Sequence, residues 1–125
     1  MFSHIMVGAN DIEKSKAFYD AVFGVLSVPP GKADAKGRIW YVTSDGSFAL
    51  TKPINGQPAT GANGATIGFN ASSPEQVQKW HDAGIEHGGV TCEDPPGLRQ
   101  PSGLYLAYLR DPAGNKLCAL HRPAP

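Results

Sequence analysis

The stretch Tyr105-Leu-Ala-Tyr-Leu-Arg-Asp-Pro-Ala-Gly-Asn-Lys-Leu-Cys-Ala-Leu-His121 is typical of two strands joined by a tight turn. Asp111-Pro112-Ala113-Gly114 has the residues that a β-turn favours: Asp first, Pro second and Gly last. The residues on either side, 105–109 and 117–120, are apolar. We therefore predict a β-hairpin at this end of the sequence.

The composition is that of one globular domain. The sequence has 125 residues, of which 41% are hydrophobic and 18% charged. Its 11 Lys and Arg balance 11 Asp and Glu, so the charge predicts neither a nucleic-acid nor a membrane partner. Two cysteines are too few for a disulfide framework. Neither a signal-peptide pattern nor an apolar run of membrane-spanning length is present, and we expect a cytoplasmic protein.

The first half predicts a strand, a helix and three more strands. Residues 3–8 are expected to form the first strand. Asn10 is expected to cap the helix, with Glu13 at capping-box spacing, and Gly24 to end it. The helix should bury a stripe at helical spacing, formed by Ile12, Ser15, Phe18, Tyr19 and Val22. The other three strands are expected at 25–28, 38–43 and 48–51, with a polar loop over 31–37.

The second half repeats this order. A strand is expected over 65–70, followed by a helix with Ser73 as N-cap, Pro74 at its first position and Gly84 at its end. A strand at 90–93 and a Pro/Gly-rich loop at 94–101 precede the final hairpin. His81 and His87, on or just after the second helix, are expected to be solvated.

Sliding the first half onto the second without gaps also matches residues. The pairs are His4 with Thr66, Ile5 with Ile67, Ala9 with Ala71, Glu13 with Glu75, Phe18 with Trp80, Asp20 with Asp82 and Ala21 with Ala83. One half cannot cover its own apolar sheet, so the two must pack together. We predict an α+β fold of two βαβββ modules related by a pseudo-twofold, with curved mixed sheets around a cleft. Module one spans about residues 1–53, a linker about 54–63, and module two about 64–125.

Several motifs extend this prediction. They are His4-Ile-Met-Val, Asp11-Ile-Glu-Lys-Ser-Lys-Ala-Phe-Tyr19, Phe23-Gly24 and Arg110-Asp-Pro-Ala-Gly-Asn-Lys-Leu117. With them, the whole sequence resembles the vicinal oxygen chelate superfamily of glyoxalase I, bleomycin-resistance proteins and extradiol dioxygenases. A small glyoxalase-like branch is similar through Asn55–Ala59, Gly88-Gly89, Pro96–Arg99 and Tyr105–Tyr108. The resemblance implies paired βαβββ modules, a homodimer and, in many members, a divalent metal in the cleft.

The resemblance also implies where metal ligands would stand. The four ligand positions of catalytic members fall on His4, Ala49, Thr66 and Cys118. Only His4 is a usual ligand, although Cys118 could bind zinc as a thiolate. Ala49 has no donor, and Thr66 has a neutral hydroxyl. We therefore expect no complete metal site and no cofactor, with His4 as the residual metal candidate.

Other side chains are expected to line the cleft. Arg38, Trp40 and Tyr105 suit a flat or anionic organic molecule, although Trp40 could equally be core. Arg99 could clamp a carboxylate from a loop at the cleft mouth or be a solvated arginine. His4 is a former ligand, a hydrogen-bonding wall residue or a general base. Cys118 is a ligand, a nucleophile or a small buried apolar residue.

Three functions fit this pattern. The first, which we prefer, is a metal-free protein that binds a small organic molecule, similar to bleomycin-resistance members. The second is a metal-dependent lyase or isomerase of glyoxalase type. The third is a metal-independent enzyme that uses His4 as acid or base. The sequence does not decide whether the protein is an enzyme.

Overall fold

The computed structural model describes residues 1–124 and has two helices and two mixed sheets. Its elements follow in this order: β1 (His4–Gly8), α1 (Ile12–Val25), β2 (Lys32–Ala33), β3 (Ile39–Thr43), β4 (Gly46–Thr51), β5 (Ile67–Asn70), α2 (Pro74–Glu86), β6 (Val90–Thr91), β7 (Gly97–Arg99), β8 (Leu104–Arg110) and β9 (Lys116–His121). The first sheet has the strand order β1-β4-β3-β2. The second has β5-β9-β8-β6, and β7 pairs with β8. The predicted α+β class is confirmed, and both sheets have the same topology, as a duplication requires.

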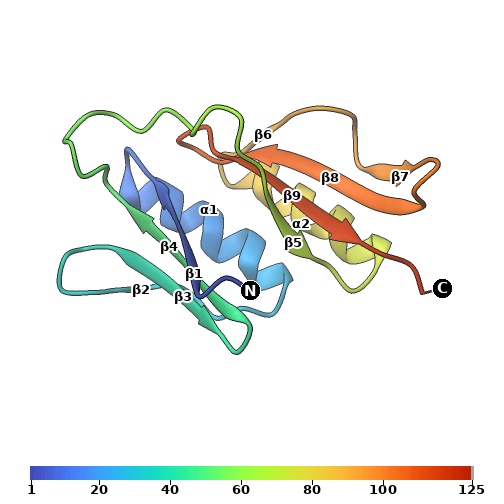
Figure 1. Cartoon of the computed structure of the whole chain (residues 1–125), viewed down its shortest axis with the longest axis horizontal. Helices are drawn as coiled ribbons and strands as arrows, with labels where there is room; N and C mark the ends of the chain where they lie inside the picture. Colours follow the sequence, from blue (N-terminus) through green and yellow to red (C-terminus); the bar gives the residue numbers. More distant parts are fainter. Residues whose placement is uncertain (125) are drawn as a thin grey trace.

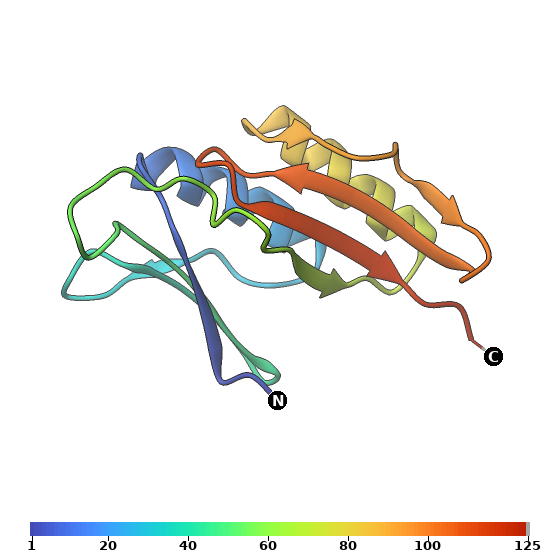
Figure 2. The same cartoon turned by 45° about the horizontal axis from the view of Figure 1, so that its top comes forward.

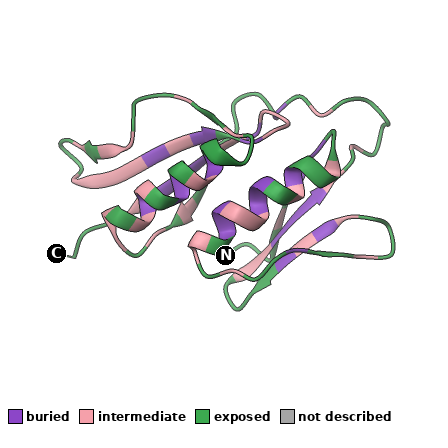
Figure 3. Ribbon diagram, turned by 180° about the vertical axis from the view of Figure 1, so that it is seen from behind, coloured by how far each residue is buried: buried purple, intermediate pink, exposed green. Residues whose placement is uncertain are grey.

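Both helices cover the same side of the two sheets (Figure 1). Seen from behind, α1 and α2 lie side by side in front of their sheets and turn their buried residues toward them (Figure 3). The two sheets are inclined to one another, and no strand of one pairs with the other in residues 1–124 (Figure 2). The face of each sheet that points away from the helices, called the open face below, is therefore covered by no helix.

The predicted final hairpin joins the two modules. The Asp111 carboxylate, 3% exposed, accepts hydrogen bonds from Ala113 N (2.9 Å), Asn115 N (2.9 Å) and Asn115 Nδ2 (2.8 Å). It also accepts one from the Tyr19 hydroxyl of α1 at 2.5 Å. Asn115 Nδ2 reaches the Gly8 carbonyl of β1 at 2.9 Å. The turn thus holds both the helix and the first strand of module one.

The linker is also held in place. The Asn10 side chain, expected to cap α1, instead pairs with Ala59: its Oδ1 accepts from Ala59 N at 2.7 Å, and its Nδ2 donates to Ala59 O at 3.1 Å. Asp11 is the N-cap, because its carboxylate accepts from Lys14 N at 3.1 Å. Gly61, with φ +85°, packs against the Gly114 carbonyl so closely that a side chain would not fit.

The segment after α1 differs from the prediction. Residues 25–28 do not form a strand, because α1 runs through Val25 and Val28 N then bonds Phe23 O at 2.9 Å in a turn. Their apolar side chains pack on the core from this turn. The edge strand β2 lies instead at Lys32–Ala33, inside the expected polar loop. Similarly, β7 forms within the Pro/Gly-rich loop expected over 94–101.

The glycines expected to end the helices lie inside them. Gly24 precedes the last residue of α1, whereas α2 continues two residues past Gly84 to Glu86. Gly84 is buried, and a Cβ there would collide with Leu109 and approach Phe18 at 3.2 Å and Val22 at 3.3 Å. Its role is close packing of α2 on α1 and β8. The predicted start of α2 is confirmed, because Ser73 Oγ accepts from Gln76 N at 3.1 Å.

His81 was expected to be solvated and is not. It is 8% exposed, and its Nε2 lies 2.9 Å from Thr91 Oγ1 of β6. Burial lowers the pKa of its imidazole. The pattern of apolar residues along α2 did not predict this burial, because it does not show that β6 covers the side of the helix that carries His81. His87, by contrast, is exposed as expected.

The Asp111 network predicts a large loss of stability on Asp111→Ala. The substitution leaves the Tyr19 hydroxyl and the Asn115 amide without their shared acceptor in a buried place, which costs about 3 kcal/mol in the free energy of unfolding. Urea denaturation should show this loss, whereas Asp82→Ala, at an exposed carboxylate of α2, changes it by less than about 0.5 kcal/mol. Equal effects of the two substitutions would contradict this account of the hairpin.

The two helical glycines should respond oppositely to alanine. Gly24→Ala meets no atom within 4 Å and removes backbone freedom from the unfolded chain, so it should stabilise the protein by about 0.5 kcal/mol. Gly84→Ala overpacks a buried contact and should destabilise it by about 1–3 kcal/mol. Thermal and urea unfolding of both variants measure the difference. If Gly84→Ala is as stable as the parent, the close packing described above is wrong.

Candidate functional site

The open faces display two equivalent rows of side chains. In the first sheet, Ala49 of β4 stands between Met6 of β1 and Trp40 of β3. In the second, Cys118 of β9 stands between Gly68 of β5 and Tyr108 of β8. Because Ile5 pairs with Phe48 and Ile67 pairs with Leu117, the two registers place Ala49 and Cys118 at equivalent positions.

A polar cluster on the first sheet contains three predicted residues. The rings of His4 and Trp40 lie 5.8 Å apart, and the Arg38 guanidinium lies 5.9 Å from the Trp40 ring. The Asp34 carboxylate holds Arg38 and Trp40 in place, because it accepts hydrogen bonds from Trp40 Nε1 at 2.9 Å and from Arg38 Nε at 2.7 Å. These hydrogen bonds, the one from Trp40 foremost, hold the pKa of Asp34 well below its usual range. His4 Nδ1 lies 2.8 Å from Ser3 Oγ.

A second cluster surrounds Cys118. Burial raises the pKa of its thiol, partly offset by a hydrogen bond with the Tyr108 hydroxyl. The Lys116 ammonium lies 5.2 Å from the Tyr108 ring centroid and pairs with Glu93, which raises the pKa of Lys116. A buried thiol with a raised pKa is a poor nucleophile.

Of the remaining predicted residues, Arg99 lies close enough to Cys118 for its charge to offset part of the rise in the pKa of the thiol, whereas Tyr105 lies apart from both clusters. Tyr105 is on the opposite face of β8, where it packs against the core with Ala107 and Leu109. The Arg99 guanidinium is bonded to carbonyls of its own loop at Gly97 (3.0 Å), Asp94 (3.2 Å) and Pro95 (3.0 Å). Thr66 is exposed immediately before β5.

Sequence reasoning missed Tyr108, which is the counterpart of Trp40. The signal was present in the final hairpin, because counting outward from its turn pairs Arg110 with Lys116 and therefore Tyr108 with Cys118. The same count places Tyr105 opposite His121. Asp34 was also missed, because only the folded loop brings its carboxylate to Arg38 and Trp40.

The donor set does not fit a metal centre. Residues 1–124 contain no group of three or more His, Cys, Asp and Glu side chains close enough to hold a metal ion. Ala49 supplies no donor, and the row around it is completed by Met6 and Trp40. Zinc and the harder divalent ions require about four or more donors. We therefore derive no metal-assisted step for this chain.

A hollow of about 980 Å³ extends along the open face of the first sheet, at the end reached by β1 and the linker. Met6, Gly8 and Thr51 form part of its wall. Three cationic side chains also line it, those of Lys36, Arg38 and Lys52, and no carboxylate does within the described chain. The hollow therefore favours negatively charged groups.

Comparisons with known proteins agree with this fold. The sequence matches the profile of the Glyoxalase/Bleomycin resistance protein/Dioxygenase superfamily over residues 1–119. The chain is 61% identical to a glyoxalase/bleomycin resistance protein from Albidiferax ferrireducens, whose crystal structure superimposes with a TM-score of 0.92 over 98% of each chain. No curated protein matches closely enough to count as a relative.

Two more distant structures show the same fold. A glyoxalase-related enzyme from Fulvimarina pelagi is 22% identical, with a TM-score of 0.76 over 98% of this chain and 88% of the other. Lactoylglutathione lyase from Agrobacterium tumefaciens is 24% identical, with a TM-score of 0.68 over 97% and 92% of the two chains. Duplicated βαβββ sheets with open faces define a vicinal oxygen chelate fold. The chain belongs to the glyoxalase/bleomycin resistance protein/dioxygenase superfamily.

The Asp34 cluster should make stability depend on pH. Because the folded-state pKa of Asp34 is below the unfolded value of about 3.9, its stabilisation is complete above that pH and is lost as the pH falls below it. Asp34→Asn should therefore be less stable than the parent at pH 7, with the difference shrinking as the pH falls toward 3. Urea unfolding across this range measures it.

An NMR measurement at Trp40 checks whether the Asp34 hydrogen bonds cause this pH dependence. The indole N–H resonance of Trp40 should shift in Asp34→Asn at pH 7, and Asp94→Asn, in an exposed loop, should leave it unchanged. A stability difference that stays constant from pH 7 to 3 would show that the Asp34 carboxylate does not stabilise the fold.

Proposed function

We propose that this member of the superfamily binds a small organic anion on the open face of the first sheet, without a metal ion and as a homodimer. The observation that carries the proposal is the cationic hollow beside the Trp40 ring. Ligand sites of this size combine apolar walls with a few well-placed polar groups.

The contacts around the hollow suit a flat acid. Met6 adds apolar area to the wall of the hollow. Trp40 and His4 do not line the hollow, but the Trp40 ring lies 5.9 Å from the Arg38 guanidinium, which does, and both rings offer faces for stacking beside it. Arg38 lines the hollow while Asp34 binds its Nε, so its guanidinium is oriented before a ligand arrives. A preorganised arginine loses less freedom on binding a carboxylate than a free one.

The uncovered faces support a homodimer. Met6 and Val42 on the first sheet are 36% and 67% exposed, although both belong to strands. Half-buried Leu106 and Tyr108 lie on the open face of the second sheet. A second copy that places its second sheet over this first sheet would cover these residues and enclose the hollow.

Neither helix of residues 1–124 has the length and hydropathy of a bilayer-spanning segment.

Two fluorescent probes test the site. 1-Anilinonaphthalene-8-sulfonate carries an anionic group that the otherwise similar N-phenyl-1-naphthylamine lacks. The anion should bind more tightly, and Lys36→Gln/Lys52→Gln should weaken its binding by about tenfold through loss of charge-assisted contacts. The neutral probe should be unaffected. Lys14→Gln/Lys79→Gln, at exposed lysines of α1 and α2, is the charge-matched control.

Further measurements separate metal-free binding by a dimer from a metal-dependent enzyme. Binding should persist in EDTA, and light scattering should give the mass of a dimer. Stoichiometric metal in protein purified without chelator, lost in His4→Ala, would replace the proposal with a metal-dependent enzyme. Equal loss of both probes in the lysine variant would show that charge does not direct binding.

A further inference from the structure

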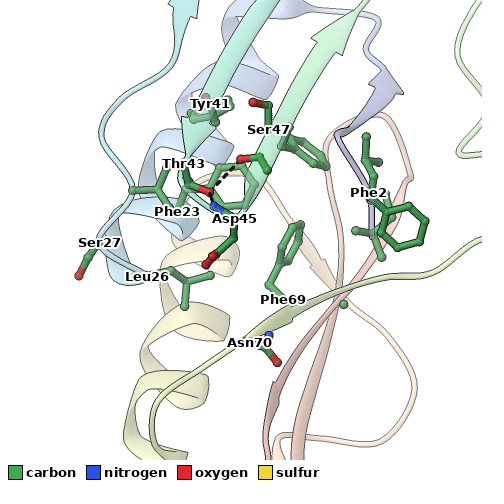
Figure 4. Close-up of a pocket in the computed structure, with 16 residues that line it drawn as sticks. Phe2, Phe23, Leu26, Ser27, Tyr41, Thr43, Asp45, Ser47, Phe69 and Asn70 are labelled. Carbon is green, nitrogen blue, oxygen red and sulfur yellow. Dashed lines mark hydrogen bonds between the residues drawn. The ribbon is translucent and has the colours of Figure 1, made fainter.

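A second cavity, of about 520 Å³, lies at the seam between the two modules. It is bounded by the C-terminal end of α1, the β3–β4 turn and β5 (Figure 4). The β3–β4 turn and the cationic hollow are at opposite ends of β4, because Gly46 lines the seam cavity and Thr51 lines the hollow. In residues 1–124 the two cavities share no lining residue.

The inner wall of the seam cavity is aromatic. The rings of Phe23 and Phe69 lie 5.1 Å apart, those of Phe48 and Phe69 5.7 Å, and those of Phe23 and Phe48 5.2 Å, all edge to face. Phe69 of module two thus completes a wall begun by module one. Leu26 adds apolar surface after α1. Aromatic and aliphatic walls of this kind favour contact with the apolar part of a ligand.

The mouth of the cavity carries one charged side chain. Asp45, in the β3–β4 turn, is the only lining residue with a charge among those described, and its carboxylate turns toward the space between Leu26 and Phe69 (Figure 4). Its backbone N–H donates to Thr43 Oγ1 at 3.2 Å, whereas its carboxylate has no hydrogen bond or ion pair within residues 1–124. Phe2, 66% exposed, also lines the cavity.

We infer that this seam cavity is a second binding site, which takes a small organic cation built on an aromatic ring system. The apolar rings would lie against Phe23, Phe48 and Phe69, and the positively charged part would meet the Asp45 carboxylate at the mouth. Aromatic faces attract cations as well as apolar groups, so both parts of the wall favour the same ligand. An organic anion is disfavoured by Asp45, which distinguishes this cavity from the cationic hollow.

A matched pair of fluorescent probes tests the inference. 9-Aminoacridine is a cation at pH 7.5, whereas acridine is neutral at that pH and nearly the same in shape. We expect saturable binding of both, tighter for the cation. Asp45→Asn should weaken 9-aminoacridine by about tenfold and leave acridine unchanged. Asp82→Asn, which removes an exposed carboxylate of α2, is the control and should change neither.

Further variants locate the bound probe. Leu26→Trp should fill the cavity and abolish binding of both probes. If that variant does not fold, Phe2→Ala, at an exposed residue, should weaken both equally. Methyl NMR resonances of Ile5, Ile67 and Val28 should shift on titration, because these residues line the cavity. Lys36→Gln/Lys52→Gln should have no effect, so the result is independent of the proposed anion site.

Three results would overturn the inference. One is absence of saturable binding, including the case in which a second copy covers the seam. Another is an equal loss of 9-aminoacridine affinity in Asp45→Asn and Asp82→Asn, which would indicate general attraction of the cation to the charge of the protein. The third is binding that persists in both Leu26→Trp and Phe2→Ala while the three methyl resonances stay unchanged.

Discussion

The Asp111 carboxylate is the constraint on which the arrangement of the two modules depends. It is buried, and it accepts hydrogen bonds from its own turn and from Tyr19 of the other module. Burial and the neighbouring carboxylate raise the pKa of the Tyr19 hydroxyl, which therefore stays protonated as the donor. Since Asn115 also reaches β1, a single turn sets where α1 and β1 lie relative to the second sheet. The seam cavity and the inclination of the two open faces both follow from that placement.

Duplication has produced one scaffold with two different chemistries. The rows Met6–Ala49–Trp40 and Gly68–Cys118–Tyr108 occupy equivalent places. The first lies beside a hollow that Lys36, Arg38 and Lys52 line, and the second lies beside a lysine paired with Glu93. The topology of each module requires only that alternate strand residues, those facing the helix, are apolar. The open-face residues are free of that requirement, so the two modules could diverge there without loss of the fold.

Features of the fold that depend on neighbouring residues were predicted from the sequence, and several that depend on distant contacts were not. The final hairpin, the Ser73 cap of α2 and the buried stripe of α1, in which only Ile12 is half-buried, were predictable because each depends on neighbours within a few residues. The second strand, the α1 cap and both helix ends were misplaced. For the α1 cap and for Gly84 the reason is a distant contact. Asn10 binds the linker, and Gly84 is selected by packing against Leu109 rather than by the end of a helix.

The sequence by itself determined the duplicated α+β architecture. It also has poor metal donors, Ala49 and Thr66, at two of the four positions where the resemblance implies ligands. Those properties are local, because they follow from residue type, alternation and turn chemistry. Only the tertiary structure decided that Tyr108 rather than Tyr105 shares a face with Cys118, and that Asp34 orients Arg38 and Trp40. Strand register and loop closure place these side chains together, and both depend on contacts that span the whole fold.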